Sequence, residues 1–476
     1  MRIHSIFKFI FFVLILSFTT TDVSSVLAAE LSLDDYLMQV RQNHEGFKAS
    51  GLKAAGFKLE ARERDLILSP NLTAEAKYLS DSKQTMDPLF QGDKTTAKFY
   101  SLGISQLTPF GLKGRLAYEL MSTTLDGVDH NFVPLSNYYE GRPVLEITQS
   151  LWKNFFGSET RAQINSIEAK ALASSFSESF KSKQLMAFAE ESYWKTRLIQ
   201  NEISVRKDTL ERANQLKAWA HRRAGLELAD KSDVLQAESA LKGRKLELQL
   251  AEDNAKEIFR NFNSLRGQDS DQLVDALNTL SPEDFKALTI PERSAMRDDT
   301  KTAEQMSRLN EAAATLNKGK AQPTLEASAS VALNGKDGGV SKTLQNSFKT
   351  NHPTYSVGIQ LSAPLGWSSA SDLREGAEKE KTAAELEYKR KFFEQEEEWK
   401  NLTQKFISAK DRLQLVRELE ESEKEKVRHE RERLQKGRTT TFQVLLFEQD
   451  YSASKLNRIQ SEGEVLTLLA QLKTFK

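Results

Sequence analysis

Acidic side chains beside two glycines are the residues whose types and spacing best suit binding chemistry in this sequence. Asp230 and Asp233 follow the first glycine, and Gln443 holds the corresponding place after the second. Carboxylates gathered around a symmetry axis repel each other, so they can bind cations or select charge. Acids at a helix start also stabilise the helix dipole, and both roles stay open. The candidate residues of the two turns are Gly225, Asp230, Asp233, Gly437, Arg438 and Gln443.

No pattern in the sequence is typical of catalysis, cofactor binding or a metal centre. The acidic run from Glu394 to Glu398 lies in a highly charged stretch and is expected to be a solvated helix face. Residues 335–339 contain three glycines, and we expect a surface loop between strands with no helix after it. The chain has no cysteine, which excludes disulfides, thiolate metal sites and cysteine nucleophiles. Its net charge is zero, whereas a nucleic-acid-binding protein is typically basic. We therefore expect neither an enzyme nor a bound cofactor.

Residues 1–28 have the organisation of a secretory signal peptide. Two basic residues open the segment, and an apolar run from Phe9 to Phe18 follows. Small residues place the cleavage after Ala28 or after Ala29. The apolar run is short for a membrane anchor, which needs about 20 residues. The sequence therefore predicts an exported protein.

Four features recur in the same order, namely a proline-opened alternating run, a later alternating segment, a long charged helical stretch and a glycine break, which indicates two copies of one unit. The prolines that open the first alternating run of each copy, Pro70 and Pro323, lie 253 residues apart. The later alternating segments repeat at 214 residues and the glycine breaks at 212. The difference, 253 − 214 = 39, places an insertion of 39 residues in the first copy, between Ala76 and Leu145.

Each copy is expected to contain a helix, strands, a long charged helix, a glycine break and a returning helix. The expected helices are 31–68, 156–223, 232–266, 295–319, 369–435 and 441–473. The expected strands are 71–80, 97–107, 112–121, 143–151, 323–333 and 353–365. A helix of about 67 residues reaches roughly 100 Å, which suits rods that pack as coiled coils rather than a globular domain. The two glycines lie where such a rod must reverse, because glycine tolerates the left-handed conformation past a helix end.

The expected strands alternate apolar and polar residues over about ten positions, which is the pattern and length of a transmembrane β-barrel strand. Aromatic residues near the strand ends, Trp152, Tyr355 and Trp367, suit the membrane–water boundary. A soluble sandwich sheet alternates in the same way, but it has no obvious means of covering such long rods. One chain supplies too few strands to close a barrel, so copies related by cyclic symmetry are expected to share it.

At these residues the sequence resembles the TolC family of outer-membrane efflux channels over nearly the whole mature chain. The segments that carry the resemblance are Leu31–Leu37, Thr148–Trp152, Gly225–Leu226 with Ser232–Ala237, Leu361–Gly366, and Gly437–Thr439 with Val444–Leu445. The family's usual tip aspartate is matched by Asp233, whereas the second copy has Gln443. The hairpin at 97–121 departs from two strands per copy, and it either enlarges the barrel or packs elsewhere.

The resemblance implies an α+β membrane protein with an internal α-β-β-α repeat. It implies a homotrimer in the bacterial outer membrane, whose β-barrel is continued by a long α-helical barrel in the periplasm. The tips would dock on a periplasmic adaptor protein and an inner-membrane pump, for efflux or type I secretion of small molecules or proteins. The expected division is signal peptide 1–28, first repeat 29–266, connector 267–291 and second repeat 292–476. The alternative is a periplasmic adaptor or scaffold protein with helical hairpins.

Overall fold

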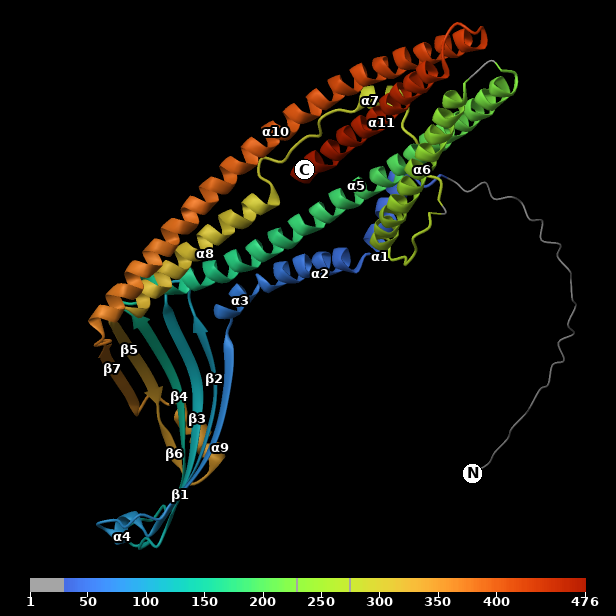
Figure 1. Ribbon diagram of the computed structural model, residues 1–476. Helices are drawn as coiled ribbons and strands as arrows, with labels where there is room; N and C mark the ends of the chain where they lie inside the picture. The colour runs from blue at the N-terminus through green and yellow to red at the C-terminus, as the bar shows by residue number, and fades with distance from the viewer. Residues whose placement is uncertain (1–29, 228–229, 274) are drawn as a thin grey trace, which may run out of the picture.

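The protein is elongated, with a β-sheet at one end and a bundle of long helices at the other (Figure 1). The computed structural model describes residues 30–227, 230–273 and 275–476, so the expected signal peptide lies outside the described residues. No helix within these ranges combines the length and the apolar character that a membrane span requires.

Two antiparallel helical hairpins form the long end of the molecule. The first pairs α5 (Ser158–Gly225) with α6 (Lys231–Leu265), and the second pairs α10 (Trp367–Gln435) with α11 (Thr441–Leu472). The helices α5 and α10 contain 68 and 69 residues, so each reaches roughly 100 Å. Ion pairs three residues apart support their exposed faces, as between Glu421 and Lys424 in α10. All four helices lie within two residues of their expected bounds.

The helix expected at 31–68 is wrong as a single element. The structure has α1 (Leu33–Asn43), α2 (Glu45–Glu60) and α3 (Glu63–Ile67) in its place. The first break occurs at His44, whose backbone is extended with φ −73° and ψ 112°. Its Nδ1 accepts a hydrogen bond from the backbone N–H of Phe47 at 3.2 Å, so His44 caps the next helix. The expected helix at 295–319 is α8 (Asp298–Lys320).

A single antiparallel sheet forms the other end. Its strands are β1 (Asn71–Asp81), β2 (Lys94–Leu107), β3 (Leu112–Asp126), β4 (Asn137–Ser150), β5 (Thr324–Leu333), β6 (Gly335–Asp337) and β7 (Pro353–Ser362). The order is β1-β2-β3-β4-β5-β7, and the short β6 pairs with β4 beyond the end of β5. The hairpin at 97–121 therefore belongs to the sheet as β2 and β3. Both strands extend past the expected bounds, as does β4.

The strand register gives the sheet one apolar face. Leu116 of β3 lies opposite Ile104 of β2 and Leu145 of β4, and Leu145 lies opposite Val331 of β5. The other face is polar and holds ion pairs. On that face Arg115 contacts Glu119 at 3.3 Å and Glu146 at 3.7 Å.

The surface loop expected at 335–339 is wrong. Residues 335–337 form β6, and α9 (Val340–Ser347) follows directly. This helix is too short to form by local propensity alone, so it depends on packing against the sheet. Its Thr343 and Ser347 are fully buried. The other short elements are α4 (Pro88–Gln91), α7 (Pro282–Ala287) and the 3₁₀ helices Phe155–Gly157 and Lys473–Phe475.

The hydrophobic core lies partway along the helical bundle, where α1 and the segment before α8 pack against the hairpins. Tyr36 of α1 stacks on Phe262 of α6, with ring centroids 4.2 Å apart. The hydroxyl of Tyr193 in α5 donates to the carbonyl of Leu31 at 2.7 Å. Leu31 also forms an isolated bridge with Leu277, which fixes the segment before α1 to the connector. The core therefore joins both hairpins to α1 and to the connector.

Candidate functional site at the helical tips

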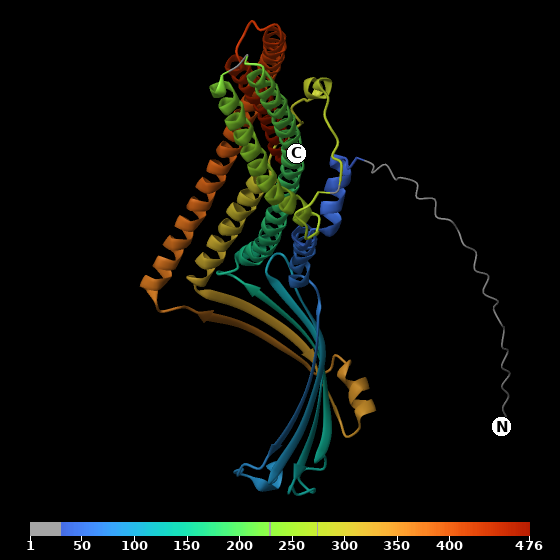
Figure 2. The same cartoon turned by 45° about the vertical axis from the view of Figure 1, so that its right-hand side comes forward.

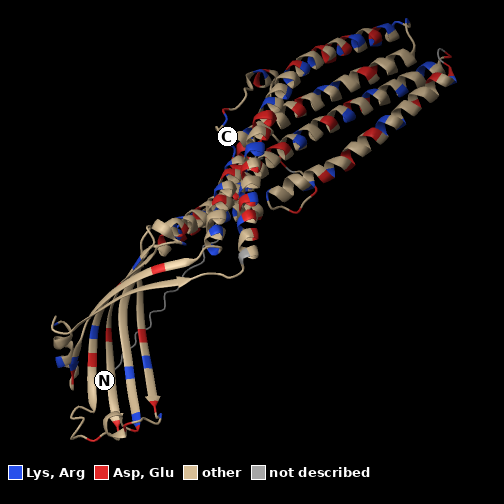
Figure 3. Ribbon diagram, turned by 90° about the vertical axis from the view of Figure 1, so that its left-hand side faces the viewer, with Lys and Arg blue, Asp and Glu red and all other residues tan. Residues whose placement is uncertain are grey.

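Both hairpin turns lie at the end of the molecule farthest from the sheet (Figures 1 and 2). Basic and acidic residues are interspersed along the rods that carry them, whereas the strands show fewer charges (Figure 3). The turn between α5 and α6 is called the first turn, and the turn between α10 and α11 the second turn. The candidate residues from the sequence are thus brought to one end.

The second turn consists of a C-terminal cap on α10 followed by an N-terminal cap on α11. Gly437 has φ +69°, and its N–H donates to the carbonyl of Leu434 at 3.0 Å. The N–H of Arg438 donates to the carbonyl of Arg433 at 2.9 Å, which completes a Schellman motif. Thr440 then caps α11, because its hydroxyl accepts from the N–H of Gln443 at 3.3 Å. The left-handed conformation expected at Gly437 is confirmed.

The first turn is built differently, and the expectation for Gly225 is wrong. Gly225 is the last residue of α5 and does not adopt a positive φ. The left-handed position falls on Glu227, with φ +56°. A side chain there costs about 1–2 kcal/mol, which glycine would avoid. The sequence carries no glycine or asparagine at position 227 to mark the turn.

The acids of the first turn lie at the start of α6. Asp230 is the N-cap residue, but its side chain makes no capping hydrogen bond. Asp233 is the acidic residue of the first helical turn, where a carboxylate stabilises the helix dipole. An acidic ring needs further copies of the chain and stays a prediction.

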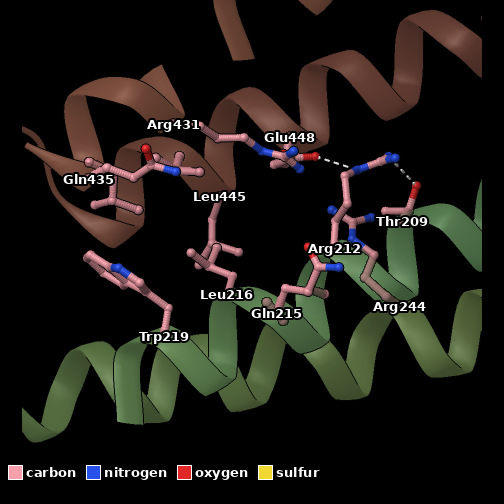
Figure 4. Close-up of a pocket in the computed structure, with 14 residues that line it drawn as sticks. Thr209, Arg212, Gln215, Leu216, Trp219, Arg244, Arg431, Gln435, Leu445 and Glu448 are labelled. Carbon is pink, nitrogen blue, oxygen red and sulfur yellow. Dashed lines mark hydrogen bonds and ion pairs between the residues drawn. The ribbon is translucent and has the colours of Figure 1, made fainter. Parts of the chain in front are cut away.

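A buried carboxylate ties the second hairpin to the first below the turns (Figure 4). Glu448 of α11 is 8% exposed. It accepts a hydrogen bond from Nε of Arg212 in α5 at 2.8 Å, and its other oxygen forms an ion pair with Arg431 of α10. These three residues, called the Glu448 clamp, join three helices. Removing one member of a buried charge pair leaves the others uncompensated, at a cost of about 3–5 kcal/mol.

Further polar contacts surround the clamp. Arg212 also donates to the hydroxyl of Thr209 at 3.0 Å, and that hydroxyl lies 3.3 Å from the hydroxyl of Ser452 in α11. Apolar side chains from Leu216, Trp219 and Leu445 line the cleft on the side of the clamp nearer the turns (Figure 4). The contact between the hairpins is thus polar around the Glu448 clamp, and it includes these apolar side chains between the clamp and the turns.

The first hairpin has an acid at the corresponding place, because Glu238 follows Val234 by four residues as Glu448 follows Val444. This acid makes weaker contacts than Glu448. Glu238 of α6 lies 3.0 Å from Nε2 of His221 and 3.8 Å from Nζ of Lys217, both in α5. Its side chain is 33% exposed. Glu238 therefore links the two helices of its own hairpin and does not reach the second hairpin through any ion pair among the described residues.

The Glu448 clamp is not among the residues predicted from the sequence. A signal for it was present, because Glu448 follows the apolar run from Val444 to Phe447 and lies one helical turn after the buried Val444. An acid on the buried face of a helix needs a partner. The sequence does not show which basic residue supplies it.

The structure places the predicted boundary aromatics at different levels of the sheet, and Tyr355 shares a row with Val331 of β5 and Leu145 of β4. Tyr355 is 74% exposed on the apolar face, near the end of β7 remote from the helices. Trp152 is exposed just after β4, at the helical end. Trp367 begins α10, and its side chain lies outside the described residues.

Within the ranges described, no cluster of three or more His, Asp or Glu residues could hold a metal ion.

No protein-family model matches the chain, and no curated protein matches it by sequence. Solved structures do match. The outer membrane protein VceC from Vibrio cholerae aligns with a TM-score of 0.64 and 14% identity, over 93% of this chain and 95% of that one. The Campylobacter jejuni CmeC outer membrane channel aligns at 0.60 and 12% identity, over 93% and 85%.

The open state of the Neisseria gonorrhoeae MtrE outer membrane channel also aligns at 0.60 and 12% identity, over 93% of this chain and 88% of that one. The match covers the sheet and both hairpins, so it applies to the whole architecture. The chain has the fold of the TolC-type outer-membrane channels.

Proposed function

We propose that this protein is an outer-membrane exit duct that three copies of the chain form together. The observation that carries the proposal is the union, in one chain, of a sheet with one apolar face and helical hairpins built on rods of 68 and 69 residues. The sheet suits a bilayer, and the rods suit a conduit that extends roughly 100 Å from it.

The two edges of the sheet favour closure between copies. Along β1 and β7 nearly every residue is exposed, and each strand has one unpaired side. The order β1-β2-β3-β4-β5-β7 contains six strands, and neighbouring strands run in opposite directions. The first and last strands are therefore antiparallel, so β7 of one copy would meet β1 of the next in antiparallel orientation. Three copies supply 6 × 3 = 18 strands. Barrels of about 16–18 strands leave an aqueous channel.

The faces of the sheet suit such a barrel. The apolar face, with Leu116, Val357 and Ile359 more than half exposed, would contact lipid. The face with Arg115, Glu119 and Glu146 would line the wet lumen. Trp152, Tyr355 and Trp367 would lie at the membrane–water boundaries. The predicted signal peptide would direct the chain to this compartment.

The helical tips would form the periplasmic aperture and the docking surface. The candidate residues of both turns lie there together, so a periplasmic adaptor protein and an inner-membrane pump would engage this end. Energy would come from these partners. Because the Glu448 clamp holds the second hairpin against α5, it would keep the aperture narrow until a partner releases it.

Cell fractionation followed by mass measurement in detergent tests the proposal. We expect the protein in the outer membrane as a trimer. A monomer in the soluble periplasm or the inner membrane would overturn the duct and favour a periplasmic adaptor. A deletion strain tested against a compound panel and for secreted proteins would then identify the cargo class.

A further inference from the structure

The short helix α9 lies on the apolar face of the sheet, which is an unusual place for a connecting segment. Its Ser347 hydroxyl is 3.1 Å from the hydroxyl of Tyr118 in β3, and Phe348 stacks on the Tyr118 ring at 6.0 Å. Tyr118 lies opposite Leu102 of β2, so it belongs to the apolar face. In Figure 2 the helix projects from the same side of the molecule as α7.

Close packing fixes α9 in this place. A side chain at Gly335 would collide with the backbone of Ser347, and one at Gly141 would collide with the Tyr118 hydroxyl. Thr343 Oγ1 donates to the carbonyl of Gly339 at 3.0 Å, and it lies 3.3 Å from the carbonyl of Tyr139 in β4. The helix is therefore an ordered part of the sheet surface.

The outer side of α9 continues the apolar face. Val340, Leu344 and Phe348 recur at every fourth position and are 40%, 42% and 61% exposed. Residues four apart share one side of a helix. The described chain leaves this stripe uncovered, and it is continuous with the apolar face of the sheet beside it.

The height of α9 on the sheet matches a membrane boundary. The helix packs at the row where Tyr100, Leu120 and Gly141 lie side by side on the apolar face. The next row outward on that face holds Tyr78, Lys98, Ser122 and Tyr139, in which both apolar side chains carry a polar hydroxyl, and the row after it holds Ser80, Thr96, Thr124 and Asn137. The apolar face thus ends at the level of α9, on the side away from the helical rods.

Charge at this level favours an anionic partner. Lys98, Lys342 and Lys349 are exposed around α9, and Lys349 also donates to the side chain of Asn346 at 2.8 Å. Asp337 is the acid next to the helix, and its carboxylate accepts from the N–H of Gly339 at 3.1 Å. An amphipathic helix with lysines beside its apolar side is the arrangement that binds anionic lipid at an interface.

We propose that α9 is an interfacial helix that binds phosphorylated lipid of the outer leaflet. Val340, Leu344 and Phe348 contact the acyl chains, while Lys98, Lys342 and Lys349 bind headgroup phosphate. The inference rests on the proposed function, because it requires the apolar face of the sheet to lie in a bilayer.

Single-site labelling tests the acyl-chain contact. Because the sequence contains no cysteine, an introduced cysteine is the only residue that the label modifies. A nitroxide is attached to Leu344→Cys in vesicles of phosphatidylcholine and phosphatidylglycerol, and its collisions with oxygen and with a water-soluble nickel chelate are measured. Leu116→Cys on the apolar face and Ser356→Cys on the polar face are the controls. We expect position 344 to behave like position 116, with high oxygen access and low nickel access.

The controls separate the two proposals. Nickel access at 344 with oxygen access at 116 overturns the interfacial helix and leaves the duct standing. Nickel access at 116 overturns the duct itself. Shielding of 344 from both reagents shows that protein covers the helix, and it overturns lipid as the occupant.

Native mass spectrometry of the intact assembly tests the headgroup contact. We expect the triple variant Lys98→Gln, Lys342→Gln, Lys349→Gln to retain about ten-fold less phosphatidylglycerol relative to phosphatidylcholine. Lys379→Gln with Lys400→Gln, on the rod of α10, is the matched control and should retain the wild-type ratio. An unchanged ratio in the triple variant overturns the role of the lysines.

Discussion

The two hairpins are built from helices of similar length, but they differ in how the chain turns and in which contacts the helices make. In the second hairpin a glycine takes the left-handed position, and the buried Glu448 bonds to α5 and α10. In the first hairpin Glu227 takes the left-handed position, and the partly exposed Glu238 contacts only its own hairpin. Of these two acids, only Glu448 therefore joins its hairpin to the other one. Under the proposed duct function, release of the second hairpin widens the tip.

Removing the buried acid should have the largest effect. Glu448→Ala leaves Arg212 and Arg431 without their shared carboxylate, and we expect a loss of about 3–5 kcal/mol in docking of the second hairpin. Amide exchange along residues 431–448 should accelerate, and channel conductance in planar bilayers should rise. Unchanged exchange and unchanged conductance would show that the clamp does not hold the tip.

A second buried acid should respond to pH. Asp298 of α8 bonds to Lys183 of α5 at 2.8 Å and to the hydroxyl of Ser179. Burial opposes ionisation, but the hydrogen bonds from Lys183, Ser179 and Lys301 outweigh it and hold the pKa of Asp298 below its ordinary value. A lowered pKa stabilises the fold above the unfolded value of about 3.9, and this stability is lost as pH falls through the folded pKa.

Asp298→Asn should therefore lose about 2 kcal/mol at pH 7 and show a flatter acid limb in urea titrations below about pH 4. Equal acid dependence in the variant and the wild type would contradict the role of Asp298. The comparison with Glu448→Ala separates a contact within the rods from a contact at the tip.

The glycines of the two turns should differ. Gly437→Ala forces a side chain into φ +69° and should cost about 1–2 kcal/mol. Gly225→Ala should be neutral or stabilising by up to about 1 kcal/mol, because Gly225 is helical and an added side chain meets open space. Thermal unfolding of both variants makes the measurement. Equal losses would show that the turns are built alike.

The exposed acid should matter least. Glu238→Ala removes contacts to His221 and Lys217 that solvent screens, so we expect a change of at most about 1 kcal/mol and wild-type conductance. An effect as large as that of Glu448→Ala would remove the difference between the hairpins.

The long elements could be read from the sequence because their signals are local. Periodicity and the absence of proline define α5 and α10, and two-residue alternation defines β7. Features that depend on tertiary contact could not be read in this way. The break at His44 and the helix α9 depend on capping and on two glycines that lie far apart in the sequence.

The candidate site was predictable in position but not in its chemistry. The glycine breaks located both turns, and Gly437 has the expected conformation. Gly225 does not, because it is the last residue of α5 and the left-handed position falls on Glu227. The partners of Glu448 come from α5 and α10, and Arg212 is 236 residues away, so nothing in the sequence pairs them.

Planar-bilayer recording of the purified protein, wild type beside Glu448→Gln, tests the central claim most directly. The amide keeps the shape of the carboxylate and removes the charge that Arg212 and Arg431 share. The duct account predicts small current steps from the wild type and steps several-fold larger from Glu448→Gln. An absence of current steps from both proteins would contradict it.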